Sequence, residues 1–377
     1  MSSTVSLAPA KSREILPLTG IRGIAATAVV LYHWSHVEAF ANPVLESVVG
    51  KGYLAVDLFF VLSGFVLGLS YGGRFASGTT AGGYRDFIVR RLARIYPMYF
   101  IVTLVYVSKE IGRVHFGGVG AGYSWMEIVG NFLMVQSWGL NLRSIGGPTW
   151  SLSAEFFAYL AFPAFVALTL RPGAKLRMVV AMLACGAIAM VALSGLGARG
   201  PLDVVDPDSF LPLLRCVGEF TLGLLAYRSI REPFVRRAFS SNAVTVVSCL
   251  AIVGFCTVAW GDPFAVLVMP ILIVNLYFQP AVARAVFGNP VVHHVGAVSY
   301  SLYLVHPLLV FVPLLVARQP LVAEMPGRNL VLLALYAAIV WATSFVCYTL
   351  IEKPGTRLAP RRRTAGITLA PARTAAE

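Results

Sequence analysis

The sequence predicts an all-α, polytopic membrane protein with about ten transmembrane helices and an additional short re-entrant or interfacial helix. Of the 377 residues, 58% are hydrophobic and only 12% are charged, whereas soluble domains carry about 25% charged residues. Apolar runs of spanning length recur along the whole chain. The basic residues are also unevenly shared between the loops on the two sides of these runs, as membrane topology requires.

A helix needs about 20 residues to cross the hydrocarbon core of a bilayer, with a range of roughly 17–25. Ten apolar segments come close to or meet this length: residues 23–40, 53–71, 88–110, 150–170, 178–196, 210–227, 243–260, 264–279, 298–317 and 329–351. An eleventh candidate, 125–138, is shorter and contains Glu127, Asn131 and Gln136. We therefore expect it to be the re-entrant or interfacial helix.

The distribution of charge favours ten spans with both termini cytoplasmic. With segment 125–138 left out, 22 of the 30 basic residues fall on the side of the N-terminus and seven on the other side. Counting that segment as a span would place 12 inside and 17 outside, against the positive-inside rule. This retention of Lys and Arg also explains the net charge of +13, so we expect no nucleic-acid partner.

The predicted domain organisation is simple. Residues 1–15 form a cytoplasmic N-terminal segment, and residues 16–354 form one membrane domain. Residues 355–377 form a basic, disordered cytoplasmic tail that lies near anionic lipid.

The first span carries an arginine and a histidine on one face. Arg22 and His33 are eleven residues apart, which is within roughly 20° of three helical turns and about 16 Å along the axis. Ionisable residues inside a bilayer are costly and indicate function. We expect His33 to act as a general base and Arg22 to lie near the cytoplasmic surface.

The third span begins with a cluster of arginines, Arg90, Arg91 and Arg94, that runs from the cytoplasmic surface into the membrane. Positive-inside anchoring explains part of this cluster. Because a guanidinium matches the geometry of phosphate oxygens, the alternative is that these residues and Arg22 form a cationic funnel for a phosphate-bearing ligand.

Two carboxylates enter the membrane from the outer side. Asp57 lies in the outer half of the second span, where it either pairs with His33 or faces water. Glu155 shares a helix face with Ser151 and Tyr159, and we expect it to line a wet cavity level with His33. In the sixth span, Arg215 and Glu219 are four residues apart and are expected to pair with each other.

The ninth span places Ser299, Tyr303 and His306 on one stripe. His306 is as compatible with a structural role as with a catalytic one. The remaining histidines, including His115 and the His293–His294 pair, have no carboxylate or thiol companions, so no metal site is predicted.

Six motifs in order resemble the membrane-bound acyltransferase-3 family of O-acyltransferases. They are LTGIRG with the Arg22–His33 spacing, FFVLSGF, RRLARIYP, WSLSAE, SYSLYLVH and IEKP. The resemblance covers residues 16 to 354. One departure is Phe156, which stands where many members have a second acidic residue.

The resemblance implies transfer of an acyl group, mostly acetyl, from cytoplasmic acyl-CoA to a hydroxyl of an envelope glycan such as exopolysaccharide or lipopolysaccharide. It assigns the functional pair to Arg22 and His33 and the arginines at the membrane entry to Arg90, Arg91 and Arg94, where we expect acyl-CoA to bind. From their positions in the sequence, we expect Glu155 or Asp57 to support His33 in catalysis. Tyr303 and His306 are additional candidates. The implied location is the bacterial cytoplasmic membrane. A two-step relay of the acyl group would need another protein, such as a separate glycan-assembly or transferase partner.

Two other classes of function remain as alternatives. A secondary transporter or flippase for an anionic glycolipid also fits ten spans and intramembrane charges, although it predicts internal repeats that the sequence does not show. A non-catalytic membrane scaffold has no need of polar stripes in four separate spans.

Overall fold

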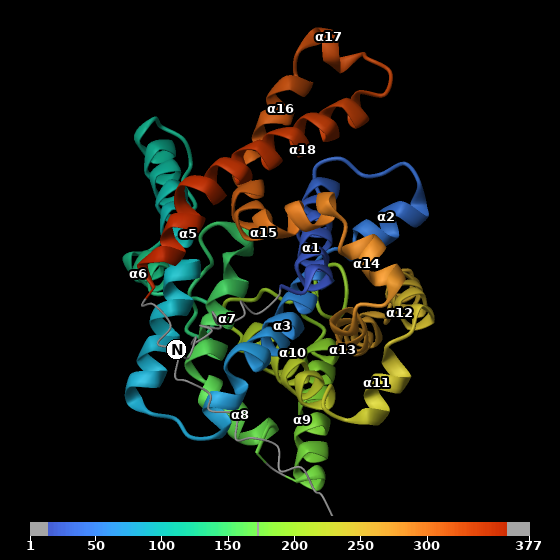
Figure 1. The fold of residues 1–377 in the computed structure, drawn as a ribbon. Coiled ribbons are helices and arrows are strands. Elements are labelled where there is room, and N and C mark those ends of the chain that lie inside the picture. The colour runs from blue at the N-terminus through green and yellow to red at the C-terminus, as the bar shows by residue number, and fades with distance from the viewer. Residues whose placement is uncertain (1–13, 172, 360–377) are drawn as a thin grey trace, which may run out of the picture.

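The computed structural model describes residues 14–171 and 173–359, and every regular element in these ranges is a helix. Figure 1 shows their arrangement. In chain order the elements are α1 (Leu16–Ser35), α2 (Pro43–Val49), α3 (Leu54–Leu67), η1 (Gly68–Gly72), α4 (Gly73–Ala76), α5 (Ala81–His115), α6 (Trp125–Phe132), η2 (Gly147–Thr149), α7 (Trp150–Leu160), α8 (Phe162–Thr169), α9 (Ala174–Leu193), α10 (Leu211–Ser229), α11 (Pro233–Phe239), α12 (Asn242–Cys256), α13 (Asp262–Phe278), α14 (Ala281–Phe287), α15 (Pro290–Leu309), α16 (Phe311–Ala317), α17 (Pro320–Ala323), α18 (Arg328–Cys347), η3 (Tyr348–Glu352), α19 (Lys353–Gly355) and η4 (Thr356–Leu358). Most of the predicted N-terminal segment and basic tail lies outside the described residues.

The all-helical class is confirmed for the described residues, but the number of spans is not. By length and composition, three helical segments can cross a membrane: Leu54–Ala76, Ala174–Leu193 and Arg328–Leu358. Four further pairs of helices, each bent by more than 40° at a short break, raise the number to as many as seven. The other three predicted spans are helical as α1, α5 and α10, and each carries charged side chains. Ten spans therefore stay a prediction.

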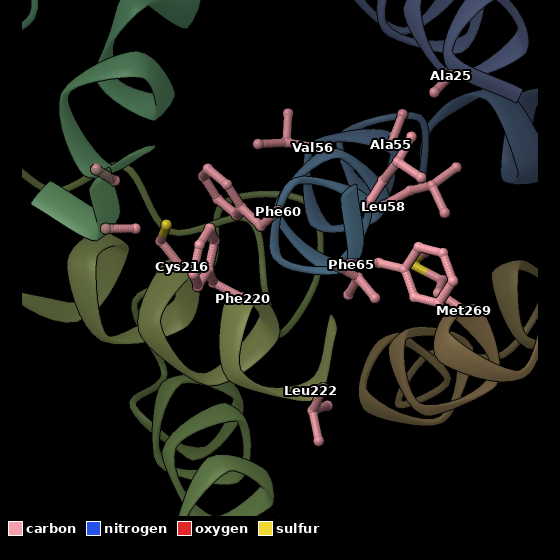
Figure 2. Close-up of a cluster of buried hydrophobic side chains, with 14 of the residues drawn as sticks. Ala25, Ala55, Val56, Leu58, Phe60, Phe65, Cys216, Phe220, Leu222 and Met269 are labelled. Atoms are coloured by element: carbon pink, nitrogen blue, oxygen red, sulfur yellow. The ribbon is translucent and has the colours of Figure 1, made fainter. Parts of the chain in front are cut away.

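Helix α3 lies at the centre of the core because most of its surface is apolar. Eleven of its 14 residues are buried. Figure 2 shows its side chains directed at neighbours on several helices, with Phe60 facing Phe220 of α10 and Phe65 lying near Met269 of α13. The backbone of α3 also approaches α10 closely, since a Cβ on Gly64 would meet the carbonyl oxygen of Phe220.

Helices α1 and α15 pack in parallel at a glycine contact. A Cβ on Gly296 would lie 2.0 Å from the carbonyl oxygen of Thr19, and one on Gly23 would lie 2.6 Å from the Gly296 nitrogen. Ten residues beyond this crossing on each helix, His33 and His306 are again in contact. Both helices therefore advance about 15 Å in the same direction from the crossing point.

The short segment after α5 folds as a capped surface helix. The eight residues of α6 are too few to cross a bilayer, which agrees with leaving residues 125–138 out of the spans. Ser124 and Glu127 form a capping box at its start. Hydrogen bonds from the Arg143 guanidinium, 2.5 Å from Nε to Oε1, hold the pKa of Glu127 at about 2.

We predict that Gly296→Ala destabilises the protein by about 1–3 kcal/mol, because its methyl group overlaps backbone that cannot move aside easily. The measurement is the unfolding midpoint of the detergent-solubilised protein. Gly254→Ala in α12 is the matched control, since a Cβ there meets nothing within 4 Å. Equal midpoints for the two variants would contradict the close packing of α1 on α15.

Candidate active site

A cavity of about 810 Å³ lies between α1, α3, α5, α7, α15 and the segment that follows α18. This volume is within the range of roughly 300–1,000 Å³ that ligand pockets occupy. Charged side chains gather on its wall: Glu14, Arg22, Arg91, Arg94, Glu155, Glu352 and Lys353. The two π-helical segments, η1 and η3, both contribute lining residues, and such segments are frequent at functional sites.

The arginines of this wall are available to a ligand. Arg22 and Arg94 make no hydrogen bond or ion pair with any residue that the structure describes. Arg91 stacks on the Tyr71 ring at 5.3 Å and contacts its hydroxyl. Arg90, in contrast, pairs with Asp86 at 3.5 Å and does not line the cavity. The predicted arginine funnel thus contains Arg22, Arg91 and Arg94 but not Arg90.

Two carboxylates face these arginines across the cavity. Glu155 accepts hydrogen bonds of 2.6 Å from Ser63 and from Tyr159, which confirms that Glu155 and Tyr159 share a helix face. Glu352 accepts a hydrogen bond of 2.8 Å from Ser301. Its place in the cavity was not predicted, although it belongs to the IEKP motif on which the family resemblance partly rests.

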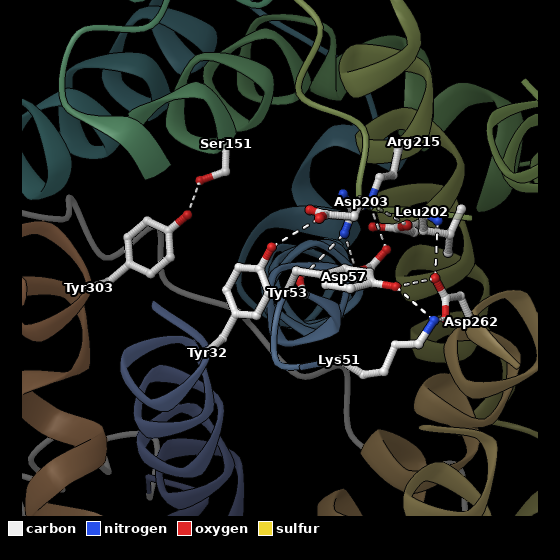
Figure 3. Close-up of polar contacts among 11 residues, drawn as sticks. Tyr32, Lys51, Tyr53, Asp57, Ser151, Leu202, Asp203, Arg215, Asp262 and Tyr303 are labelled. Atoms are coloured by element: carbon white, nitrogen blue, oxygen red, sulfur yellow. Dashed lines mark hydrogen bonds and ion pairs between the residues drawn. The ribbon is translucent and has the colours of Figure 1, made fainter. Parts of the chain in front are cut away.

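The end of the cavity beside Tyr303 is aromatic. Tyr303 closes it, held by hydrogen bonds to Ser151 Oγ at 2.7 Å and to the Pro148 carbonyl at 2.9 Å. Figure 3 shows this Tyr303–Ser151 contact. The Phe59 ring meets the Tyr303 ring edge-on with 6.0 Å between centroids. This end of the cavity is therefore mainly apolar, with the Glu155 carboxylate one helical turn from Ser151 on α7.

His33 lies just beyond this aromatic end and pairs with His306. The Tyr303 ring centroid is 6.1 Å from that of His306, and His306 Nε2 is 3.2 Å from His33 Nδ1. His306 is fully buried, whereas His33 is half-buried. His33 itself does not line the cavity, and it is linked to the Tyr303 end through His306.

Backbone carbonyls fix the tautomers of the two histidines. His33 Nδ1 lies 2.9 Å from the Val29 carbonyl oxygen, and His306 Nδ1 lies 3.2 Å from that of Leu302. Because a carbonyl oxygen only accepts, each Nδ1 must carry the hydrogen. The one His33 Nδ1–H is then shared between the Val29 carbonyl and His306 Nε2, and His33 Nε2 keeps a free lone pair. That is the tautomer a general base needs.

Asp203 is a carboxylate next to the His33 turn, and the sequence analysis did not connect the two. Tyr32 donates to Asp203 at 2.9 Å (Figure 3). The Tyr32 ring also meets the rings of His33 and His36 edge-on. Arg199, from the same loop, donates to Ser35. The loop thus covers the end of α1 that carries His33.

Asp57 neither pairs with His33 nor faces water, so both alternatives offered by the sequence are wrong. Its carboxylate accepts two hydrogen bonds from Arg215, the Nε bond at 2.8 Å, and both side chains are fully buried. Arg215 also makes the predicted contact with Glu219, at 3.7 Å. A buried guanidinium needs a carboxylate within reach, and α10 packs against α3 so that Asp57 fills this need.

We predict that Asp57→Asn lowers the unfolding free energy by about 3 kcal/mol or more, because it leaves the Arg215 charge poorly compensated inside the protein. The exposed pair Arg228–Glu232 supplies the control Glu232→Gln, which should cost less than about 1 kcal/mol. Denaturant unfolding in detergent measures both. A stable but inactive Asp57→Asn protein would show instead that Asp57 takes part in catalysis.

Comparisons with known proteins place this architecture in a family. A family model described as an acyltransferase domain matches residues 16–352. The chain is 29% identical to the acyltransferase MdmB of Streptomyces mycarofaciens, over 94% of this chain and 95% of that protein. It is 25% identical to the peptidoglycan O-acetyltransferase OatA of Listeria monocytogenes, over 91% of this chain but 56% of that protein. No solved structure matches. Helical architecture, cavity and family match together show that the chain belongs to the acyltransferase domain family and is a membrane acyltransferase.

Proposed function

We propose that this acyltransferase moves an acetyl group from cytoplasmic acyl-CoA to a hydroxyl of a cell-envelope carbohydrate. The proposal rests on the spatial order of three features. Arg22, Arg91 and Arg94 line one region of the cavity, Tyr303 closes its aromatic end, and the His33–His306 pair lies directly behind Tyr303. A donor with phosphates at one end and a thioester at the other fits this sequence of groups.

The arginines suit the phosphates of the coenzyme. Guanidinium groups bind phosphate oxygens through paired N–H donors, and two of these three have no partner among the described residues. Glu155 and Glu352 would orient them or contact the acceptor. With the arginine end at the cytoplasmic surface, both termini would also be cytoplasmic, in the bacterial inner membrane.

The chemistry assigned to His33 balances without a covalent enzyme intermediate. Nε2 takes the proton of the acceptor hydroxyl while the oxygen attacks the thioester carbonyl. The carbon–sulfur bond then breaks, and the imidazolium returns the proton to the departing thiolate. The second nitrogen stays bonded to Val29 and His306 throughout, which keeps the ring in place.

The relatives support an envelope acceptor. OatA is named a peptidoglycan O-acetyltransferase, and family membership favours acyl transfer over a transporter or flippase. The acceptor class proposed for this chain is an exopolysaccharide, lipopolysaccharide or related glycan. A glycan-assembly protein that presents the acceptor would be its partner.

We predict that His33→Ala lowers kcat by roughly 10²–10⁴-fold, the usual contribution of a general base. Arg22→Ala should mainly raise KM for acyl-CoA, by roughly tenfold or more, because a charge-assisted hydrogen bond is lost. Transfer of labelled acetyl from acetyl-CoA to envelope glycan in membranes measures both. Arg85→Ala, an exposed arginine of α5, is the matched control. Normal transfer by the His33→Ala protein would contradict the role of His33 as general base.

His306 is a positioning residue in this account. His306→Leu removes the acceptor for the His33 Nδ1–H and should lower kcat by roughly tenfold or more, as loss of an orienting partner does. His306→Gln keeps an acceptor oxygen and should restore part of the rate. The acidic limb of the kcat–pH profile should also move in His306→Leu. Identical pH profiles and identical rates for the two variants would leave His306 only a packing role.

A further inference from the structure

The two ends of the cavity differ in polarity, and this difference bears on the acyl group that the donor can carry. The charged residues of the cavity come from the start of α1, from α5, from Glu155 of α7 and from the segment after α18. The region next to the histidines is lined by Val56, Phe59, Phe60, Ser151, Leu152 and Tyr303, which we name the acyl chamber. Its one small polar side chain, Ser151, is already bonded to Tyr303.

The register of the helices puts the acyl chamber at the reacting atoms. Tyr303 precedes His306 by three residues on α15, which is about 4.5 Å along the axis. Arg22 lies about 16 Å below His33 on α1. A donor whose phosphates contact the arginines must therefore extend along the cavity and leave its acyl group beside Phe59 and Tyr303.

Phe59 is the residue of this wall that limits the depth of the acyl chamber. Its side chain is partly buried and packs against two separate apolar clusters. One is the main core around α3, and the other contains Ala26, Val30, Trp34 and Leu302. The phenyl ring thus separates the acyl chamber from the second cluster. Tyr303 cannot yield as easily, because two hydrogen bonds hold its hydroxyl.

We infer that Phe59 is the specificity-determining residue for acyl length and that it restricts the donor to short acyl groups of the acetyl class. This inference rests on the proposed function. Truncating Phe59 opens the acyl chamber toward the apolar side chains behind it. A longer acyl chain then gains apolar contacts that the native protein denies it.

The test compares acetyl-CoA with hexanoyl-CoA on the full-length protein in nanodiscs, by equilibrium binding of each labelled thioester. Transfer of the same labels to envelope glycan in membranes gives the kcat/KM ratio. For Phe59→Ala, we expect the hexanoyl-to-acetyl ratio to rise by roughly tenfold or more, with Phe59→Leu intermediate. Phe264→Ala, an exposed phenylalanine of α13, is the control and should not change the ratio.

The outcomes separate this inference from the proposed function. If native protein binds and uses acetyl-CoA but both Phe59 variants keep the native binding ratio, the acyl chamber is wrong and the proposed function stands. If Phe59→Ala is inactive in transfer, the hexanoyl-to-acetyl binding ratios of the two Phe59 variants still test the acyl chamber. If native protein neither binds acetyl-CoA nor transfers its label, the proposed function fails and the acyl chamber fails with it.

Discussion

The parallel packing of α1 on α15 is the constraint on which the site depends. The Gly23–Gly296 crossing lets the two backbones approach closely, and the equal advance of both helices then brings His33 and His306 together. The same approach places Arg22 and Tyr303 on the wall of one cavity. A shift of one helix by a single turn, about 5.4 Å, would separate the histidines and uncouple the cavity from the base.

The charged side chains inside the bundle are of two kinds: those that pair with another residue and those that line the cavity, where a ligand could bind them. Arg215 is compensated by Asp57, and Lys51 by Asp262, whose carboxylate also accepts a hydrogen bond from Tyr53 (Figure 3). These pairs tie α3 and the turn before it to α10 and α13. In contrast, the arginines of the cavity face open space. A partly buried charge without a counter-ion is costly, so Arg22 and Arg94 are expected to be kept for a ligand that compensates them.

Sequence reasoning predicted what lies along a single helix and missed what lies between helices. The face shared by Arg22 and His33 follows from helical periodicity, and α1 is unbroken across both residues. The spacing of Arg215 and Glu219 also predicted a real contact, but the dominant partner of Arg215 is Asp57, 158 residues away in sequence. Nothing in the local pattern of α3 or α10 could reveal that pairing.

The His33–His306 contact was missed for the same reason, since it joins residues 273 apart. The span count was harder to predict because sharp bends interrupt two of the candidate segments, 150–170 and 298–317, and proline accounts for part of this by removing a backbone donor, as at Pro307. Arg90 shows that clustering of arginines in the sequence is weak evidence that they share one site. It is adjacent to Arg91, yet a rotation of about 100° per residue takes it away from the cavity.

The central claim is that the donor extends from the arginines to the histidine pair. A cryo-electron microscopy structure of the protein with a non-hydrolysable thioether analogue of acetyl-CoA tests it most directly. We expect the diphosphate to contact Arg22, Arg91 and Arg94, and the acyl carbonyl to lie beside Tyr303 on the side of His33. An analogue bound outside the cavity, or bound with its acyl end among the arginines, would contradict the account.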